Sequence, residues 1–122
     1  VERNPTAFQY LLENARLNDV TDRVHPYRAD CRDVVAGVSV DRVVMGYYDA
    51  HEYLDSALEA LESGGIVHLH EATPEPLVFD RPIGRLEKTA DEHDRSVAVL
   101  ETRRVKTYSE GVEHVVIDAR VS

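Results

Sequence analysis

The sequence is poor in several features that define whole classes of protein. It has a single cysteine, Cys31, in 122 residues, which excludes an internal disulfide or a cysteine metal cluster and suits a reducing compartment. No apolar run approaches the roughly 20 residues that span a bilayer, and the N-terminus lacks the basic, apolar and small-residue order of a signal peptide. We therefore expect a soluble, cytoplasmic protein with no membrane partner.

Glycine and proline are also scarce, at 6 and 5 residues, while 43% of the chain is hydrophobic. This balance excludes a disordered or low-complexity chain and is typical of an ordinary globular domain that buries a core. No repeat or linker interrupts it. The sequence therefore predicts one domain over residues 1–122.

Lysine is nearly absent, since Lys88 and Lys106 are the only two, and 23 acidic residues face 14 basic ones for a net charge of -9. A nucleic-acid binder normally carries the opposite sign. An acidic surface suits high salt, because in molar salt the Debye length falls to about 3 Å and the surface no longer repels polyanions at range. The composition thus favours a halophilic source.

The first half of the chain contains signals for one helix and two strands. Asn4 is a typical N-cap and Pro5 a typical first helical residue, and apolar residues then recur at helical spacing until Leu17-Asn18-Asp19. Arg23 to Tyr27 reads as a short strand before a turn at 30–33. Val40 to Met45 reads as the next strand.

The second half continues the alternation and then changes pattern. A helix over 53–61 is predicted to end at a left-handed cap, Gly64-Gly65. A strand over 66–69 and a loop over 73–82 follow, and Pro82 opens a third helix. The last two strands, over 97–108 and 113–121, are joined by Ser109-Glu110-Gly111 and predict an antiparallel hairpin.

This order predicts an α/β fold: a parallel sheet with helices on both faces and an antiparallel edge. Ligands of such sheets bind beyond the carboxyl ends of the strands. Three candidate positions lie there: Glu2, Asp30 and Met45-Gly46-Tyr47.

Each candidate has a functional and a structural interpretation. Glu2 is placed to accept from both hydroxyls of a ribose, or is simply an acid near a helix N-terminus. Asp30 is placed to accept from the amine of an adenine, or caps its own turn. Gly46 leaves room for a ligand near the backbone, or is an ordinary turn glycine.

A larger set of motifs runs from Glu2 through the terminal hairpin. The motifs are Glu2-Arg3-Asn4-Pro5, Leu12-Glu13-Asn14, Leu17-Asn18, Asp30-Cys31-Arg32-Asp33, Asp41 to Tyr47, Gly64 to His70, Tyr108, Gly111, His114-Val115-Val116 and Asp118. Together they resemble the catalytic half of archaeal enzymes that modify the purine beside the tRNA anticodon. These are class I S-adenosylmethionine (SAM)-dependent enzymes: the tRNA guanine-37 N1-methyltransferases and the related aminocarboxypropyltransferases of the wybutosine pathway.

The resemblance implies a Rossmann-like sheet whose first strand and glycine-rich loop are missing. In the family these elements precede the position of Glu2, together with domains that grip tRNA. We therefore expect a partial catalytic domain, with tRNA as partner through segments largely absent here. Exposed sheet edges of neighbouring copies are expected to pair, which predicts self-association.

The resemblance also implies the reaction. The methyltransferase branch ends the strand at Met45 with an Asn-Leu-Pro sequence, whereas Gly46-Tyr47 stands here, as in the aminocarboxypropyl branch. This implies transfer of the 3-amino-3-carboxypropyl group of SAM to 4-demethylwyosine at position 37 of tRNA-Phe. Glu2 would hold the ribose, Asp30 and the Cys31 backbone the adenine, and Met45-Gly46-Tyr47 the floor of the donor site. Arg3 is counted with them among the cofactor-binding residues.

Two alternatives remain open: a guanine-37 N1-methyltransferase, and a catalytically silent domain that binds a nucleotide or a partner. No general base is identified, so the catalytic residue is unknown. His68 and His70 share a face of a strand and are interpreted as structural or substrate-facing, because a metal site needs a third convergent ligand. Asp30 should raise the pKa of Cys31, which argues against a nucleophile.

Overall fold

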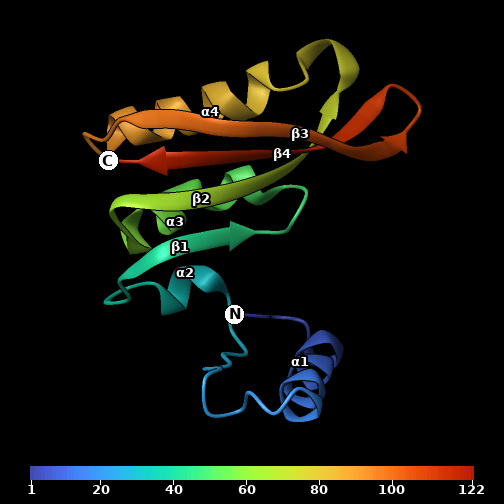
Figure 1. The fold of residues 1–122 in the computed structure, drawn as a ribbon, viewed down its shortest axis with the longest axis vertical. Helices are drawn as coiled ribbons and strands as arrows, with labels where there is room; N and C mark the ends of the chain where they lie inside the picture. The colour runs from blue at the N-terminus through green and yellow to red at the C-terminus, as the bar shows by residue number, and fades with distance from the viewer. The chain divides into compact units, whose positions relative to one another are not determined.

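The computed structural model describes residues 1–122 and divides into two compact units, residues 1–38 and 39–122. The first unit contains two helices, α1 (Pro5–Leu17) and α2 (Cys31–Val34). The second contains a four-stranded sheet with its helices (Figure 1).

Helix α1 begins where the sequence predicts. The Asn4 side-chain oxygen accepts hydrogen bonds from the backbone N–H groups of Thr6 at 2.9 Å and Ala7 at 3.1 Å, which satisfies two of the unpaired donors of the first turn. Pro5 occupies the first helical position. Of the apolar stripe, only Ala15 is buried; Phe8 and Leu11 are half-buried.

The strand predicted over Arg23 to Tyr27 is wrong. Residues 24–29 have no regular secondary structure, and their link to the chain's start is one hydrogen bond, from the Glu2 N–H to the Tyr27 carbonyl at 2.9 Å. A strand needs a ladder of such bonds with a neighbour. The turn predicted at 30–33 is instead the start of α2.

The sheet unit has the order β1-β2-β4-β3. Strands β1 and β2 are parallel, and β4 is antiparallel to both β2 and β3, so the predicted parallel region and terminal hairpin are confirmed. The strands are β1 (Val40–Met45), β2 (Leu61–Pro74), β3 (Val97–Ser109) and β4 (Val112–Val121).

The helices of this unit all come between its strands. The short helix η1 (Ala50–Tyr53) leads into α3 (Leu54–Ala60), and η2 (Glu75–Leu77) precedes α4 (Asp80–Glu92). None of the chain's helices has both the length and the apolar composition that spanning a membrane requires.

The hydrophobic core lies between the two main helices and one face of the sheet. Alternate residues of β2 and β4 point into it and are fully buried, as are the large side chains of α3 and α4 that meet them. Burying each such side chain contributes roughly 1.5–3 kcal/mol. The core includes Leu54, Leu58, Leu86, Val67, Leu69, Ile117, Ala119 and Val121.

Helices on both faces of the sheet were predicted, but within this unit α3 and α4 lie on the same face, behind the sheet in Figure 1. The opposite face carries the alternating partners of the core residues. Among them Val44 is 67% exposed, and Arg42, His68 and Asp118 form polar contacts above the strands. We call this surface the open face.

The predicted cap at Gly64-Gly65 is also wrong. Helix α3 ends at Ala60, and both glycines lie in β2, where the register with β1 shifts. Gly64 has φ +83°, and a Cβ on Gly65 would lie 2.9 Å from the Glu62 carbonyl oxygen, so both positions require glycine. A bulge and a helix cap share the same Gly-Gly signal, which explains the misassignment.

The loop predicted over Thr73 to Pro82 is shorter than expected. Strand β2 continues to Pro74 because its ladder with β4 runs to the Pro74–Val112 pair, and α4 begins at Asp80, two residues before Pro82. The β3–β4 turn is tied to this segment by a hydrogen bond from the Glu75 N–H to the Gly111 carbonyl, at 2.8 Å.

Candidate functional site

Glu2 lies directly before α1, in irregular backbone. One oxygen of its carboxylate accepts from the Asn4 N–H at 2.9 Å, which fixes the direction of the side chain. Its own N–H donates to the Tyr27 carbonyl and thereby holds the start of the chain beside the segment that leads to Asp30. The carboxylate is half-buried, and its second oxygen remains for a ligand hydroxyl.

Asp30 caps α2, which is the structural interpretation of this residue. Its carboxylate accepts from the Arg32 N–H and Nε, both at 2.9 Å, and from Arg32 Nη2 at 2.6 Å. Arg3 approaches to 3.6 Å. The Arg32 hydrogen bonds and the two positive charges hold the pKa of Asp30 well below its usual range, so the group is a permanent anion at neutral pH.

Cys31 follows at the first position of α2 and is free of any disulfide. Burial raises the pKa of its thiol, and the neighbouring Asp30 charge raises it further. The predicted direction is confirmed, with burial as the larger cause. The Arg32 N–H donates to the Asp30 side chain, and the Asp33 N–H donates to the Asp30 carbonyl.

The remaining three predicted residues form the end of β1 and the loop after it, in the sheet unit. Met45 is the last residue of the strand and is buried, with 8% of its surface exposed. Tyr47 is 57% exposed, and its ring meets that of Tyr53 edge to face at 6.3 Å. We call residues 46–49 the β1 loop; its end is held by a hydrogen bond from the Ala50 N–H to the Tyr47 carbonyl.

Nothing in the local structure requires glycine at position 46. Its φ is not in the left-handed region, and a Cβ added there would meet no atom within 4 Å. This contrasts with Gly65, where the Leu61 side chain and the Glu62 carbonyl oxygen fill that space. The surface at Gly46 is therefore open to a group from outside the sheet unit.

The seven predicted cofactor residues thus fall into two groups. Glu2, Arg3, Asp30 and Cys31 come together in the first unit, through the Glu2–Tyr27 and Arg3–Asp30 contacts. Met45, Gly46 and Tyr47 are contiguous in the second unit.

Sequence reasoning did not identify a ring cluster beside the β1 loop. The Tyr48 ring lies 4.7 Å from that of Tyr108 and 4.9 Å from that of His114, both edge to face. His114 Nε2 in turn contacts His70 Nδ1 at 2.9 Å. Only the spacing of His70 on its strand gave a signal, because the four residues come from four separate elements: the β1 loop, β2, β3 and β4.

A second polar group crosses the open face from edge to edge. His68 Nδ1 lies 2.6 Å from Asp118 Oδ1, Arg42 contacts the other nitrogen of His68, and Arg103 donates to the second oxygen of Asp118 at 3.2 Å. His68 and His70 are therefore engaged with other side chains of the sheet, in accord with their structural interpretation. Each of the four residues comes from a different strand.

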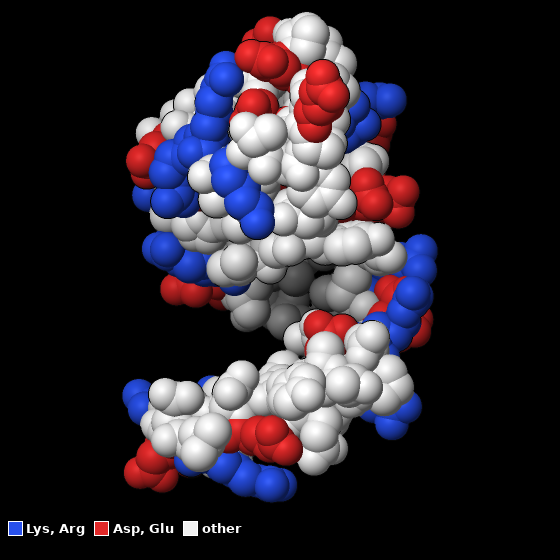
Figure 2. Space-filling model, turned by 90° about the vertical axis from the view of Figure 1, so that its right-hand side faces the viewer, with Lys and Arg blue, Asp and Glu red and all other residues white.

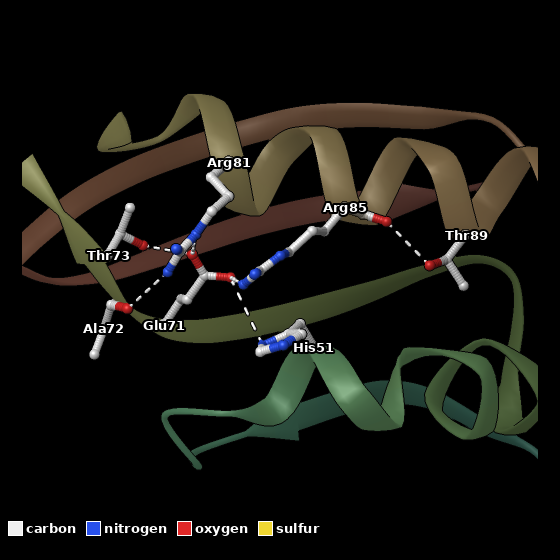
Figure 3. A network of polar contacts seen from close by, with 7 residues as sticks. All are labelled: His51, Glu71, Ala72, Thr73, Arg81, Arg85 and Thr89. Carbon is white, nitrogen blue, oxygen red and sulfur yellow. Dashed lines mark hydrogen bonds and ion pairs between the residues drawn. The ribbon is translucent and has the colours of Figure 1, made fainter. Parts of the chain in front are cut away.

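Glu71 forms a charged network on the core side of the sheet (Figure 3). Its carboxylate is 1% exposed, accepts from Thr73 and Arg81 at 2.5 and 2.9 Å, and is paired with Arg85. Burial by itself would raise the pKa of Glu71, but these three hydrogen bonds outweigh it and lower the pKa. The His51 ring reaches the same carboxylate at 4.0 Å, so the network joins η1, β2 and α4.

The acidic excess is unevenly distributed over the surface. Figure 2 faces the side toward which β1 points, and Lys and Arg side chains gather there at the upper left, while Asp and Glu gather nearer the top. A net charge of -9 thus coexists with a locally basic area.

Comparison with known proteins identifies a family and several relatives of the chain. Residues 1–100 match the family described as the TRM5/TYW2 methyltransferase domain. The chain is 42% identical, over 98% of its length, to the tRNA(Phe) (4-demethylwyosine(37)-C(7)) aminocarboxypropyltransferase of Methanocaldococcus jannaschii, and 33% identical, also over 98%, to the tRNA (guanine(37)-N(1))-methyltransferase Trm5b of Pyrococcus abyssi.

The likeness extends to the backbone. The crystal structure of M. jannaschii TYW2 in complex with AdoMet superposes with a TM-score of 0.91 at 41% identity, covering 99% of this chain and 55% of that one. The chain spans about half the length of the first curated relative, 48%, and 36% of Trm5b. The fold resemblance predicted from the motifs is confirmed, and the chain belongs to the TRM5/TYW2 methyltransferase domain family.

Proposed function

We propose that the protein containing this chain transfers the 3-amino-3-carboxypropyl group of SAM to 4-demethylwyosine at position 37 of tRNA-Phe. The observation that carries this choice is the higher identity to the aminocarboxypropyltransferase, 42% against 33% for Trm5b. The proposal is tested by nucleoside mass spectrometry of hypomodified tRNA-Phe after incubation with the full-length product of the gene. A carboxypropyl-bearing nucleoside is expected, and a product bearing only a methyl group would contradict it.

The residues of the first unit fit the adenosine part of SAM. A ribose presents two hydroxyl donors, and the Glu2 carboxylate is an oriented acceptor. An adenine presents an amine donor and ring-nitrogen acceptors, which match the Asp30 carboxylate and the Cys31 N–H. Arg32 engages both Asp30 oxygens, but a carboxylate offers about four acceptor positions, so the amine need not displace it.

Replacing Asp30 by alanine is expected to lower SAM affinity of the full-length protein about 100-fold, because the adenine loses its acceptor and α2 its cap. Isothermal titration calorimetry measures the affinity. Asp33→Ala is the matched control: it removes an acid from the same short helix, and its affinity should stay within about twofold. Equal affinities of the two variants would refute the role of Asp30.

The β1 loop fits the selection of the carbon that reacts. SAM supplies a sulfonium that activates each of its attached carbons, so the site chooses among them by alignment with the nucleophile. The open surface at Gly46 offers room for the methionine arm, and the exposed Tyr47 ring beside it offers a stacking surface for an unpaired base.

The second candidate is guanine-37 N1-methylation, favoured by the match to the methyltransferase domain family and to Trm5b. In that case the β1 loop would seat the guanine while the methyl carbon is presented to it. The silent-domain interpretation is the least favoured of the three.

The proposal also covers the localisation of the protein, its source and its partners. We place it in the cytoplasm of a halophilic archaeon, with tRNA bound largely by segments outside this chain, and copies of the isolated chain pairing through the edge of β1. With a net charge of -9, melting temperature should rise by at least several degrees between about 0.1 M and 3 M KCl as like charges are screened. A melting curve that is highest at low salt would contradict this adaptation.

A further inference from the structure

The β1 loop has few attachments of its own. Gly46 and Tyr47 are exposed, the Tyr47 ring meets that of Tyr53 of η1, and the chain is buried again only at Ala50, which is 2% exposed. Between Met45 and Ala50, Tyr48 alone places a ring against β3 and β4, two strands that do not adjoin β1 in the sheet. The Tyr48 ring therefore joins the loop to β3 and β4, in addition to the local Tyr47–Tyr53 ring contact and the hydrogen bond from the Ala50 N–H to the Tyr47 carbonyl.

Tyr48 is held from two directions. Its ring meets that of Tyr108 of β3, with 60° between the planes, and that of His114 of β4, with 88°. Both are edge-to-face arrangements, the geometry that aromatic rings prefer. Tyr48 is half-buried by these contacts, whereas Tyr108 keeps 52% of its surface exposed.

The His114 ring, one of the two that contact Tyr48, is itself held in place. His114 is buried, with 9% of its surface exposed, and the contact of its Nε2 with His70 Nδ1 ties it to β2. Burial lowers the pKa of both histidines, and their neighbours Lys106 and Arg103 lower them further, so the pair is uncharged at neutral pH. An uncharged pair shares one hydrogen bond without repulsion, which keeps the ring in place against Tyr48.

We propose that Tyr48 is a positioning residue for the donor site, and that the cluster of Tyr48, Tyr108, His114 and His70 sets where Gly46 and Tyr47 stand. The cluster touches no reacting atom. It acts through the main chain of the β1 loop, whose displacement by even 1 Å is enough to misalign a reacting carbon. The effect on the reaction rests on the proposed function, whereas the effect on the loop does not.

Hydrogen exchange tests the anchor without reference to activity. In the full-length protein, Tyr108→Leu should accelerate amide exchange of residues 46–49 about tenfold, because one of the two ring contacts of Tyr48 is lost. Tyr48→Leu should accelerate it at least as much, and Tyr48→Phe, which keeps the ring, should not. The peptide over 66–69 serves as the internal reference. Unchanged exchange of 46–49 in Tyr108→Leu would overturn the inference, even if Tyr48→Leu does not fold.

A kinetic comparison then tests the consequence. Tyr108→Leu lies outside the donor site, yet it should lower the ratio of carboxypropyl to methyl transfer about fivefold and raise the KM for SAM. Tyr10→Leu is the matched control on the 60% exposed tyrosine of α1, and it should change neither quantity. A double variant Tyr48→Leu/Tyr108→Leu should be no worse than Tyr48→Leu alone, since both act through one contact. Additive losses would overturn the positioning role.

The experiments distinguish a failure of the proposed function from a failure of the positioning role of the cluster. If the wild-type protein transfers only methyl groups, the proposed function fails, and the exchange experiment still decides the anchor. If the wild type transfers the carboxypropyl group but Tyr108→Leu leaves the amide exchange rate of residues 46–49 unchanged, the positioning role of the cluster is wrong and the proposed function stands.

Discussion

Replacing Gly46 by alanine should lower carboxypropyl transfer about 100-fold while the melting temperature of the full-length protein changes by no more than about 2 °C. The first effect is expected because the added methyl group enters the space assigned to the methionine arm and misaligns the reacting carbon. The second is expected because that methyl group meets no protein atom within 4 Å and the φ at Gly46 suits any residue. Steady-state kinetics with hypomodified tRNA-Phe and a thermal melt measure the two quantities.

Gly84 supplies the matched control for this substitution. It lies exposed in the middle of α4, and an added Cβ there also meets nothing within 4 Å. Gly84→Ala should raise stability by roughly 0.5–1 kcal/mol, as in any helix interior, and leave the transfer rate unchanged. If Gly46→Ala keeps wild-type transfer, the role of this position in the donor site is wrong.

The largest effect on stability is expected from removing both arginines that neutralise Glu71. In Arg81→Met/Arg85→Met the carboxylate remains buried with only the Thr73 hydroxyl and the His51 ring near it, which should cost about 3 kcal/mol in the free energy of unfolding at pH 7. Urea unfolding of the full-length protein measures the loss. Lys88→Met, on the exposed face of the same helix, should cost less than about 0.5 kcal/mol.

The same variant should reverse the pH dependence of this contribution. In the wild type the pKa of Glu71 is lowered by folding, so its contribution is fully present above about pH 4.3 and is lost as the pH falls through the folded value. Without the arginines, burial raises the folded pKa above 4.3, and the folded state binds the proton first. The variant should then gain stability on acidification from pH 7 to about 4.5. An equal stability gap at both values would contradict the charged state assigned to Glu71.

The sequence was informative where the signals are local. Asn4-Pro5 located the start of α1, the run from Val40 located β1, and the turn around Gly111 joined the terminal hairpin, because caps, short strands and tight turns are encoded within a few residues. Gly64-Gly65 misled because the same dipeptide serves a helix cap and a strand bulge. The strand predicted over residues 23–27 was wrong because a local strand propensity does not provide the neighbouring strand with which it must pair.

The candidate site divides in the same way. Asp30 and Glu2 were chosen as residues beyond strand ends, but neither follows a strand in the structure: each lies directly before a helix, and its ligand role stays a prediction. The cluster around Tyr48 and the network around Glu71 were not identified, because their members are brought together by the register of strands that lie far apart in the sequence. Tyr48 and Tyr108 are adjacent only once β4 has paired with both β2 and β3.

The most direct test of the proposed reaction follows two labels of SAM in one experiment. The full-length protein is incubated with hypomodified tRNA-Phe and with SAM labelled either in the methyl carbon or in the carboxypropyl carbons, and the label in the tRNA is counted. The proposal predicts carboxypropyl label in the tRNA and methyl label left on the released nucleoside. Methyl label in the tRNA without carboxypropyl label would contradict it and would move the protein to the methyltransferase branch of its family.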